Sequence, residues 1–119
     1  MQFTNDKPIY QQIIDLVMEK ILKKEWAAGE KILSVRDLGA TLEVNPNTIM
    51  RSYEKLQQDK IIFNKRGLGF FVAEDAQDQI IRLRKESFLE QEAPRFLQTA
   101  KLLNISIDEI TDLYNAIEL

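Results

Sequence analysis

The sequence contains no cysteine and no histidine among its 119 residues. Without cysteine, disulfides and thiolate metal sites are excluded. Without histidine, the chain lacks the usual general base and the commonest transition-metal ligand. No apolar run approaches the roughly 20 residues that a membrane-spanning helix needs, and the polar segment 1–7 does not resemble a signal peptide. We therefore expect a soluble cytoplasmic protein with no cofactor, no metal and no membrane partner.

Positive charge is scarce in the second part of the chain. Residues 74–119 hold five basic side chains against ten acidic ones, whereas residues 1–73 hold eight Lys and three Arg against nine acids. The net charge of −3 at first argues against a nucleic-acid partner, but DNA binding needs a basic face and not a basic whole. The asymmetry favours a basic working half followed by an acidic appendage. The alternative is an uneven scatter of surface charge without functional meaning.

The first predicted helix follows Pro8, which belongs in a first helical turn, with Asn5 or Asp6 as the N-cap. It should end before Gly29. Its apolar residues recur at helical spacing and form one wide buried face. These residues are Ile9, Tyr10, Ile13, Ile14, Val17, Met18, Ile21 and Leu22.

Two further helices are predicted close together. The sequence Ser-Val-Arg-Asp that starts at Ser34 has the form of a capping box and opens a short helix that ends near Leu42. After a tight turn, Asn45 is the N-cap and Pro46 the first residue of a helix that runs to about Asp59. Helix, tight turn and helix in this order indicate a helix-turn-helix.

A small β-hairpin is predicted after the second of these helices. Residues 61–63 and 70–72 are rich in Ile, Phe and Val and read as strands. Gly67 and Gly69 mark the bend between them, and Lys65 and Arg66 lie at its tip, where a basic cluster can reach phosphates or a minor groove. The combination predicts a mainly α fold with an N-terminal winged helix-turn-helix. Taken alone, the glycines are no more than turn residues.

The helix after Asn45 has a polar face suited to DNA. Asn47 and Arg51 carry side chains that pair with adenine and guanine edges in the major groove, and Thr48 and Lys55 suit phosphates. The opposite face, with Ile49, Tyr53 and Leu56, is expected to pack inward. An ordinary solvated helix face is the alternative for the polar residues, and the neighbouring short helix and wing disfavour it.

Residues 75–119 are predicted to form a helical tail beside a DNA-binding domain at 1–74. A helix is expected over residues 78–103, kinked or broken by Pro94, and Ser106 begins a second capping box that opens a last helix through about Ile117. An apolar stripe runs along the longer helix, and an isolated helix pair cannot bury it alone. The stripe consists of Ile81, Phe88, Leu89, Phe96 and Leu103.

Four motifs in this order resemble the GntR family of bacterial transcription regulators. They are Pro-Ile-Tyr-Gln-Gln-Ile at 8–13, Gly-Glu-Lys-Ile-Leu-Ser-Val-Arg-Asp-Leu at 29–38, Val-Asn-Pro-Asn-Thr-Ile at 44–49 and Gly-Leu-Gly-Phe-Phe-Val at 67–72. The Asn-Pro-Asn-Thr turn and the short tail are similar to the YtrA-type subfamily. The resemblance is strong over residues 8–73 and looser in the tail.

The resemblance implies DNA contacts at positions that match the family. Arg36 would contact DNA from the helix before the turn, and Thr48 from the start of the recognition helix. Arg66 and Gly67 stand where the wing contacts lie. Gly39 stands where the family often has alanine, and we expect it to loosen the short helix slightly.

Two departures concern base readout. Pro46 and Met50 occupy positions where many family members have arginine. The subfamily commonly has a basic residue one place after the second of these, and Arg51 matches it. Base readout is therefore expected to depend on Asn45, Asn47 and Arg51, and a generic family operator should not be assumed.

The leading interpretation is a sequence-specific DNA-binding homodimer that represses transcription from an inverted-repeat operator. In the subfamily the tail serves dimerisation and the regulated genes often encode ABC-type transporters, although nothing in this chain indicates those genes. A small-molecule effector is unknown. Three alternatives remain open: a winged helix that binds a protein, an enzyme, for which no nucleophile–base pair is visible, and a tail that folds back on its own winged domain.

Overall fold

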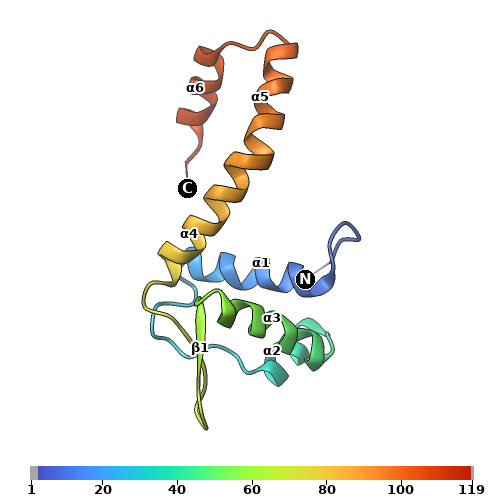
Figure 1. The fold of residues 1–119 in the computed structure, drawn as a ribbon, viewed down its shortest axis with the longest axis vertical. Coiled ribbons are helices and arrows are strands. Elements are labelled where there is room, and N and C mark those ends of the chain that lie inside the picture. The colour runs from blue at the N-terminus through green and yellow to red at the C-terminus, as the bar shows by residue number, and fades with distance from the viewer. Residues whose placement is uncertain (1–2, 119) are drawn as a thin grey trace. The chain divides into compact units, whose positions relative to one another are not determined.

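The computed structural model describes residues 3–118 and is mainly helical, as the sequence predicted (Figure 1). Its elements in chain order are α1 (Ile9–Leu22), α2 (Val35–Leu42), α3 (Pro46–Gln58), β1 (Ile62–Lys65), β2 (Gly69–Val72), α4 (Ala76–Ser87), the π-helical turn η1 (Phe88–Glu92), α5 (Ala93–Leu102) and α6 (Ile107–Ala116). The strands form one antiparallel hairpin, the predicted wing. Across the described residues, no helix combines the length and apolar character that crossing a membrane requires.

The chain divides into two compact units, Met1–Arg82 and Leu83–Leu119. The division falls inside α4, whereas the sequence placed the domain boundary after residue 74. The physical reason is burial, because Ala76 and Ile80 at the start of α4 are almost completely enclosed. Gln77 adds to this attachment by donating from its side-chain amide to the carbonyls of Ile21 and Leu22, at 3.4 and 3.3 Å.

The start of α1 differs from the prediction. The N-cap is Pro8, which has no side-chain acceptor, and neither Asn5 nor Asp6 caps the helix. The preceding segment is held instead by Gln12, whose amide donates to the carbonyls of Thr4 and Lys7, both at 2.8 Å. A side chain one turn inside the helix thus replaces the cap that local sequence suggested.

The predicted caps of α2 and α3 are confirmed. Ser34 Oγ accepts a hydrogen bond from the Asp37 amide at 3.0 Å, and Asn45 Oδ1 accepts one from the Asn47 amide at 2.8 Å. Between the helices, Glu43 adopts a left-handed conformation with φ of +57°. Each cap satisfies an amide that the first helical turn leaves without a partner, so the turn is defined at both ends.

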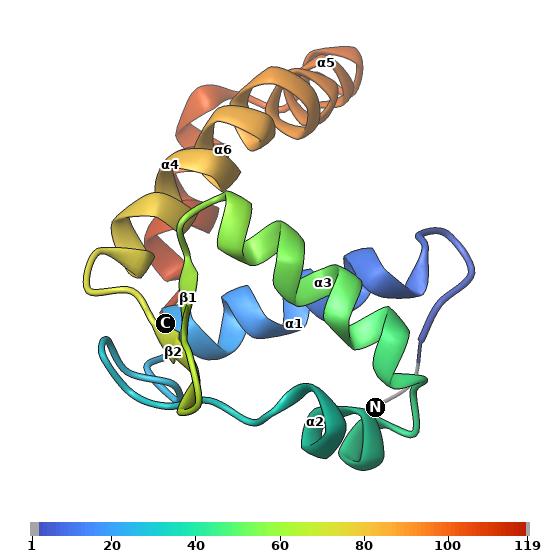
Figure 2. The same cartoon turned by 60° about the horizontal axis from the view of Figure 1, so that its bottom comes forward.

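The core of the first unit lies where α1 and α3 pack side by side (Figure 2). Ile49, Tyr53 and Leu56 are fully buried, as predicted. The Tyr53 hydroxyl donates to the Leu33 carbonyl at 2.7 Å, and its ring meets Phe70 of the wing edge-on at 5.0 Å. Burial raises the pKa of the Tyr53 phenol from its ordinary value of 10.0. One side chain therefore ties α3 to the loop before α2 and to β2.

The wing is broader than a simple hairpin. The segment before α2 lies along β2, where the Ile32 amide donates to the Phe70 carbonyl at 2.9 Å and the Val72 amide to the Glu30 carbonyl at 3.0 Å. Lys31 forms an isolated bridge with Phe71. This third segment anchors the hairpin to the body of the unit and brings residues far apart in the sequence to one surface.

In the second unit, Pro94 does not end the helical path. The backbone is right-handed helical at both Glu92 and Ala93, and the Ala93 amide donates to the Phe88 carbonyl, five residues back. Proline has no amide hydrogen and displaces the carbonyl four residues earlier, and the π-helical turn accommodates it. α5 then ends before Asn104, which has φ of +57°.

The last helix begins as predicted, because Ser106 Oγ accepts a hydrogen bond from the Glu109 amide at 3.1 Å. It ends at Ala116, one residue before the predicted end. In Figure 1 the chain reverses its direction in the loop between α5 and α6.

Candidate nucleic-acid interface

The polar face of α3 is open to solvent. Asn47, Arg51 and Lys55 are exposed, while Thr48 is half-buried. Asn45 is exposed at the N-cap, but its side-chain oxygen is engaged by the Asn47 amide. The backbone amide of Asn47 is therefore occupied by the cap and is not free to bind a ligand. The partial positive charge at the N-terminus of α3 lies next to the exposed Asn47 side chain. The helix can offer amide and guanidinium groups to base edges without rearranging its backbone.

The guanidinium of Arg51 lies over an aromatic ring from another helix. Its guanidinium carbon lies 3.8 Å from the ring centroid of Tyr10, which belongs to α1. Within residues 3–118, Arg51 forms no ion pair with any carboxylate. The charge of this residue is consequently not neutralised by the protein.

Lys55 differs from Arg51 because it has an acidic neighbour. Its ammonium group lies 3.3 Å from Asp59 Oδ1, one helical turn onward. An exposed pair of this kind contributes only about 0.3–0.5 kcal/mol, so a phosphate can compete for the lysine.

Sequence reasoning overlooked Glu54, which is exposed and lies on the same face as Asn47 and Arg51. Helical spacing of three and seven residues was the signal that could have identified it.

Arg36 is exposed at the second position of α2. Among the described residues it has no ion-pair partner. In Figure 2, α2 lies near the N-terminal end of α3, where the two helices are joined by the turn. Arg36 and Asn47 therefore come from the two helices that meet at that turn.

The wing tip carries the predicted cations, but they are not equivalent. Lys65 lies over Phe71 and Phe63, with 4.6 and 5.6 Å from its ammonium nitrogen to the ring centroids. Arg66 is exposed and free of such a ring contact in the described part of the chain. Gly67 has φ of +81° and open space around it. The tip can therefore approach another surface closely, with the exposed Arg66 next to Gly67.

Sequence reasoning missed a third cation at the wing. Lys31 is exposed, and its side chain lies across Gly69, where an added Cβ would sit 3.1 Å from Lys31 Cε. Gly69 has φ of +114°, which also disfavours any other residue there. The strand pairing of residues 30–32 with β2 brings Lys31 to the wing, across β2 from the strand that carries Lys65, and no local sequence signal indicates that pairing.

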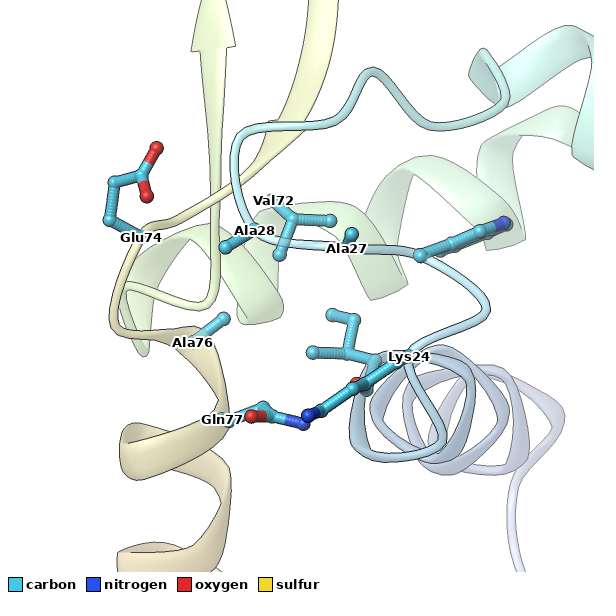
Figure 3. Close-up of a pocket in the computed structure, with 9 residues that line it drawn as sticks. Lys24, Ala27, Ala28, Val72, Glu74, Ala76 and Gln77 are labelled. Atoms are coloured by element: carbon cyan, nitrogen blue, oxygen red, sulfur yellow. The ribbon is translucent and has the colours of Figure 1, made fainter.

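A small cavity of about 160 Å³ lies elsewhere in the first unit, between the end of α1, the loop after it and the start of α4. Figure 3 shows Lys24 and Gln77 on one side of it, with Glu74 turned away. None of the predicted DNA-contacting residues lines this cavity. The described residues also contain no group of three or more acidic side chains placed to hold a metal ion.

Comparisons with known proteins match this geometry. The model of the bacterial regulatory protein gntR family matches residues 9–72. The chain is 34% identical to the uncharacterized HTH-type transcriptional regulator YhcF of Bacillus subtilis over 93% of this chain and 90% of that protein. It is 29% identical to the HTH-type transcriptional repressor YtrA of the same organism, over 87% and 78% of the two chains.

A solved structure extends the similarity to the tail. A GntR family transcriptional regulator from Listeria monocytogenes superposes with a TM-score of 0.78 at 35% identity, covering 98% of this chain and all of that one. The winged helix-turn-helix and the short helical tail therefore occur together in related proteins. On this evidence the protein belongs to the GntR family, resembles its YtrA-type members, and is a DNA-binding transcription regulator and not an enzyme.

Proposed function

We propose that the protein is a homodimeric repressor that binds an inverted-repeat operator. The observation that carries the proposal is the exposure of large apolar side chains in the tail. Phe96 is 56% exposed and Leu103 65% exposed, and Phe88 and Leu89 are exposed to a similar degree. Apolar surface of this kind marks an interaction site in a soluble protein. Ile81, at 52% exposure in α4, belongs to the same predicted set.

The helix α6 enlarges the apolar surface beyond the residues that the sequence stripe included. No residue of α6, as described, is buried, and Ile107, Leu113 and Tyr114 are largely exposed. In α5 only Ala100 is buried. A helix pair with so little core of its own gains most of its stabilisation by covering this surface, at about 25 cal/mol for each Å² of apolar area removed from water.

The π-helical turn η1 affects which large apolar side chains of the tail lie on the same side of the helix. Seven residues make nearly two turns of α-helix, and Phe96 and Leu103 are seven apart. Phe88 and Phe96 are eight apart, which would rotate one away from the other in a regular helix. Because a π turn takes an additional residue, η1 compensates for the eighth one. Phe88, Phe96 and Leu103 can thus share one contact face.

Two-fold symmetry then sets the form of the operator. A homodimer with closed symmetry presents two identical recognition helices, and such dimers read half-sites related by the same two-fold axis. We assign base readout to Asn45, Asn47 and Arg51. Phosphate and backbone contacts are assigned to Arg36, Thr48, Lys55, Lys65, Arg66 and Gly67.

Repression follows as the simplest use of such a complex. A dimer seated on a promoter excludes RNA polymerase, and no catalytic group or effector is needed for that. The similarity to a Bacillus subtilis protein named as a transcriptional repressor supports this choice. Control of transporter genes and a cytoplasmic location, where the chromosome lies, are part of the same proposal.

The test begins with selection of binding sites from a randomised duplex library by the full-length protein. We expect two half-sites in inverted orientation, and sedimentation equilibrium should give a dimer at micromolar concentration. Placing the selected site across a promoter should reduce transcription in a purified system when the protein is added. A selected site with one unrepeated half, or a monomer by sedimentation, would contradict the dimer. Unchanged or increased transcription would contradict repression.

A further inference from the structure

Tyr10 has no role at the DNA interface in either the sequence interpretation or the family comparison. Its ring nevertheless stacks under the guanidinium of Arg51, at 3.8 Å from ring centroid to guanidinium carbon. Arginine stacks well on aromatic faces because its guanidinium is planar and weakly hydrated. The contact joins α1, which does not belong to the helix-turn-helix pair, to the polar face of the recognition helix.

The backbone of Tyr10 is held in place. The Tyr10 carbonyl accepts a hydrogen bond from Ser52 Oγ at 2.8 Å, and Ser52 is the residue next to Arg51. Ser52 is buried, and so are Ile13 and Ile14, which follow Tyr10 in α1. The backbone beneath the ring is therefore fixed to the same turn of α3 that carries the arginine.

A stack restrains Arg51 without consuming its hydrogen bonds. A guanidinium that lies parallel to a ring covers only its face, and its N–H groups then point outward in the plane of the group. A free arginine side chain loses rotamer entropy when it is fixed. Part of this cost is already met before DNA arrives if the ring selects the orientation. No carboxylate in residues 3–118 forms an ion pair with the same guanidinium.

We propose that Tyr10 is a positioning residue that pre-orients Arg51 for reading a base edge. The inference deepens the proposed function, because it rests on Arg51 being a base-reading residue. Its specific content is that the ring of Tyr10 raises affinity for the cognate site and leaves affinity for unrelated DNA unchanged. A ring that merely packs α1 against α3 would affect both kinds of DNA alike.

The experiment is a double-mutant cycle in the full-length protein, with Tyr10→Leu, Tyr10→Phe, Arg51→Ala and Tyr10→Leu/Arg51→Ala. The probes are a duplex selected by the parent protein from a randomised library and a scrambled duplex of equal length and composition. Fluorescence anisotropy measures affinity, and thermal melting checks that each variant is folded. We expect Tyr10→Leu to weaken binding to the selected duplex by about 3- to 10-fold. Tyr10→Phe should bind like the parent, because it keeps the ring.

The Arg51→Ala background separates the two roles of the ring. There, Tyr10→Leu should cause no further loss, since the residue that it positions is absent. An equal loss on both duplexes, a loss that persists without Arg51, or no loss in either background would overturn the inference. If Arg51→Ala itself fails to discriminate between the duplexes, the base-reading role assigned to Arg51 is wrong, and the positioning role falls with it.

A second measurement follows the stack directly. Ring currents should shift the Arg51 side-chain protons upfield in the parent and in Tyr10→Phe, and the shift should vanish in Tyr10→Leu. An absent upfield shift in the parent would overturn the inference irrespective of the DNA results. A persistent shift in Tyr10→Leu would do the same, because another ring would then be responsible.

Discussion

The two compact units treat apolar side chains in opposite ways. In the first unit, Ile13, Val17, Ile49 and Leu56 have no solvent exposure, and even the hydroxyl of Tyr53 has a partner. In the second, Ala100 is buried and large apolar side chains face solvent. The core of the first unit is completed within one chain, although Ile81 near its end is exposed, whereas the second unit retains an apolar surface that a second chain can cover.

Because of this contrast, we expect substitutions to have three different effects, depending on where they lie. Changes in the tail should act on assembly, changes in the core of the first unit on stability, and changes on its polar surface on DNA binding. The substitutions that follow test this separation, and their expected effects decrease from the tail to the wing.

The largest effect is expected in the tail. Phe96→Asp/Leu103→Asp places two charges on the proposed contact face and should convert the dimer to a monomer by sedimentation. Because two linked recognition helices bind more tightly than one by about 10²- to 10⁴-fold, operator affinity should fall within that range. The matched control Gln98→Asp/Asn115→Asp adds the same charge at exposed polar positions and should leave the dimer intact. A dimeric Phe96→Asp/Leu103→Asp variant would show that the tail face is not the interface.

On α3, Arg51→Ala and Lys55→Ala should differ in kind. Arg51→Ala should cost about 1–3 kcal/mol on the selected operator and relax specificity there. Lys55→Ala should weaken operator and scrambled DNA about equally, because a lysine on phosphate reads no sequence. Anisotropy titrations on both duplexes measure the difference. Equal losses on both DNAs for both variants would contradict the division of roles.

Gly39→Ala tests the packing of the helix-turn-helix, and here the structure corrects the sequence interpretation. A glycine at this helical position was expected only to loosen α2, yet an added Cβ would lie 2.8 Å from the backbone oxygen of Val44. Backbone cannot move aside easily, so the clash should outweigh the gain in helix propensity of about 1 kcal/mol. We expect a net loss of about 1–3 kcal/mol in the free energy of unfolding.

Thermal or denaturant unfolding measures that loss. Ala40→Gly, at the neighbouring exposed position, provides a control that changes propensity alone by about 1 kcal/mol. A Gly39→Ala variant more stable than the parent would mean that the turn relaxes at no cost.

Tyr53→Phe should destabilise the first unit by about 1 kcal/mol at neutral pH, because the Leu33 carbonyl loses its donor. The pH dependence has a definite sign. Burial raises the folded-state pKa above the ordinary 10.0, so the unfolded state releases the proton first as the pH rises. The contribution of Tyr53 is thus complete below pH 10 and declines above it. Unfolding measured between pH 8 and 11 should show a steeper decline in the parent than in Tyr53→Phe, and parallel curves would contradict the assignment.

The smallest effects are expected at the wing. Arg66→Gln and Lys31→Gln should each remove one phosphate interaction, which reduces the slope of log affinity against log salt by about 0.9, without changing the melting temperature. Lys65→Gln should lower the slope as well, but it also removes the cation above Phe71 and should cost about 0.5–1 kcal/mol of stability. If all three variants keep the parent's salt slope, the wing does not touch phosphates.

Local signals predicted most of the fold because they act within a few residues. Ser34 and Asn45 cap helices through amides two or three residues away, and such bonds are encoded by residue type and spacing alone. The same logic predicted Ser106 as a cap and the inward face of α3. It was wrong at Asn5 and Asp6, where the side chain of Gln12, several residues onward, supplied the hydrogen bonds that hold the segment.

Long-range pairings were beyond the reach of those signals. The attachment of Ala76 and Ile80 to the first unit moved the boundary from residue 74 into α4. The bridge between Lys31 and Phe71 added a cation to the wing. Each depends on which elements pack together, and that choice is made by the whole core and not by any window of sequence.

The sequence by itself determined the element order, most of the helix caps, the family and the chemistry of the polar face, because residue type and spacing are sufficient for each. Tertiary structure alone decided which cations are accessible, since neighbours from other elements set their surroundings. It placed Arg51 on the ring of Tyr10, Lys65 over Phe71, and Lys31 across Gly69. It also decided that Gly39 meets the turn at Val44, because that close approach exists only once α2 and α3 are packed.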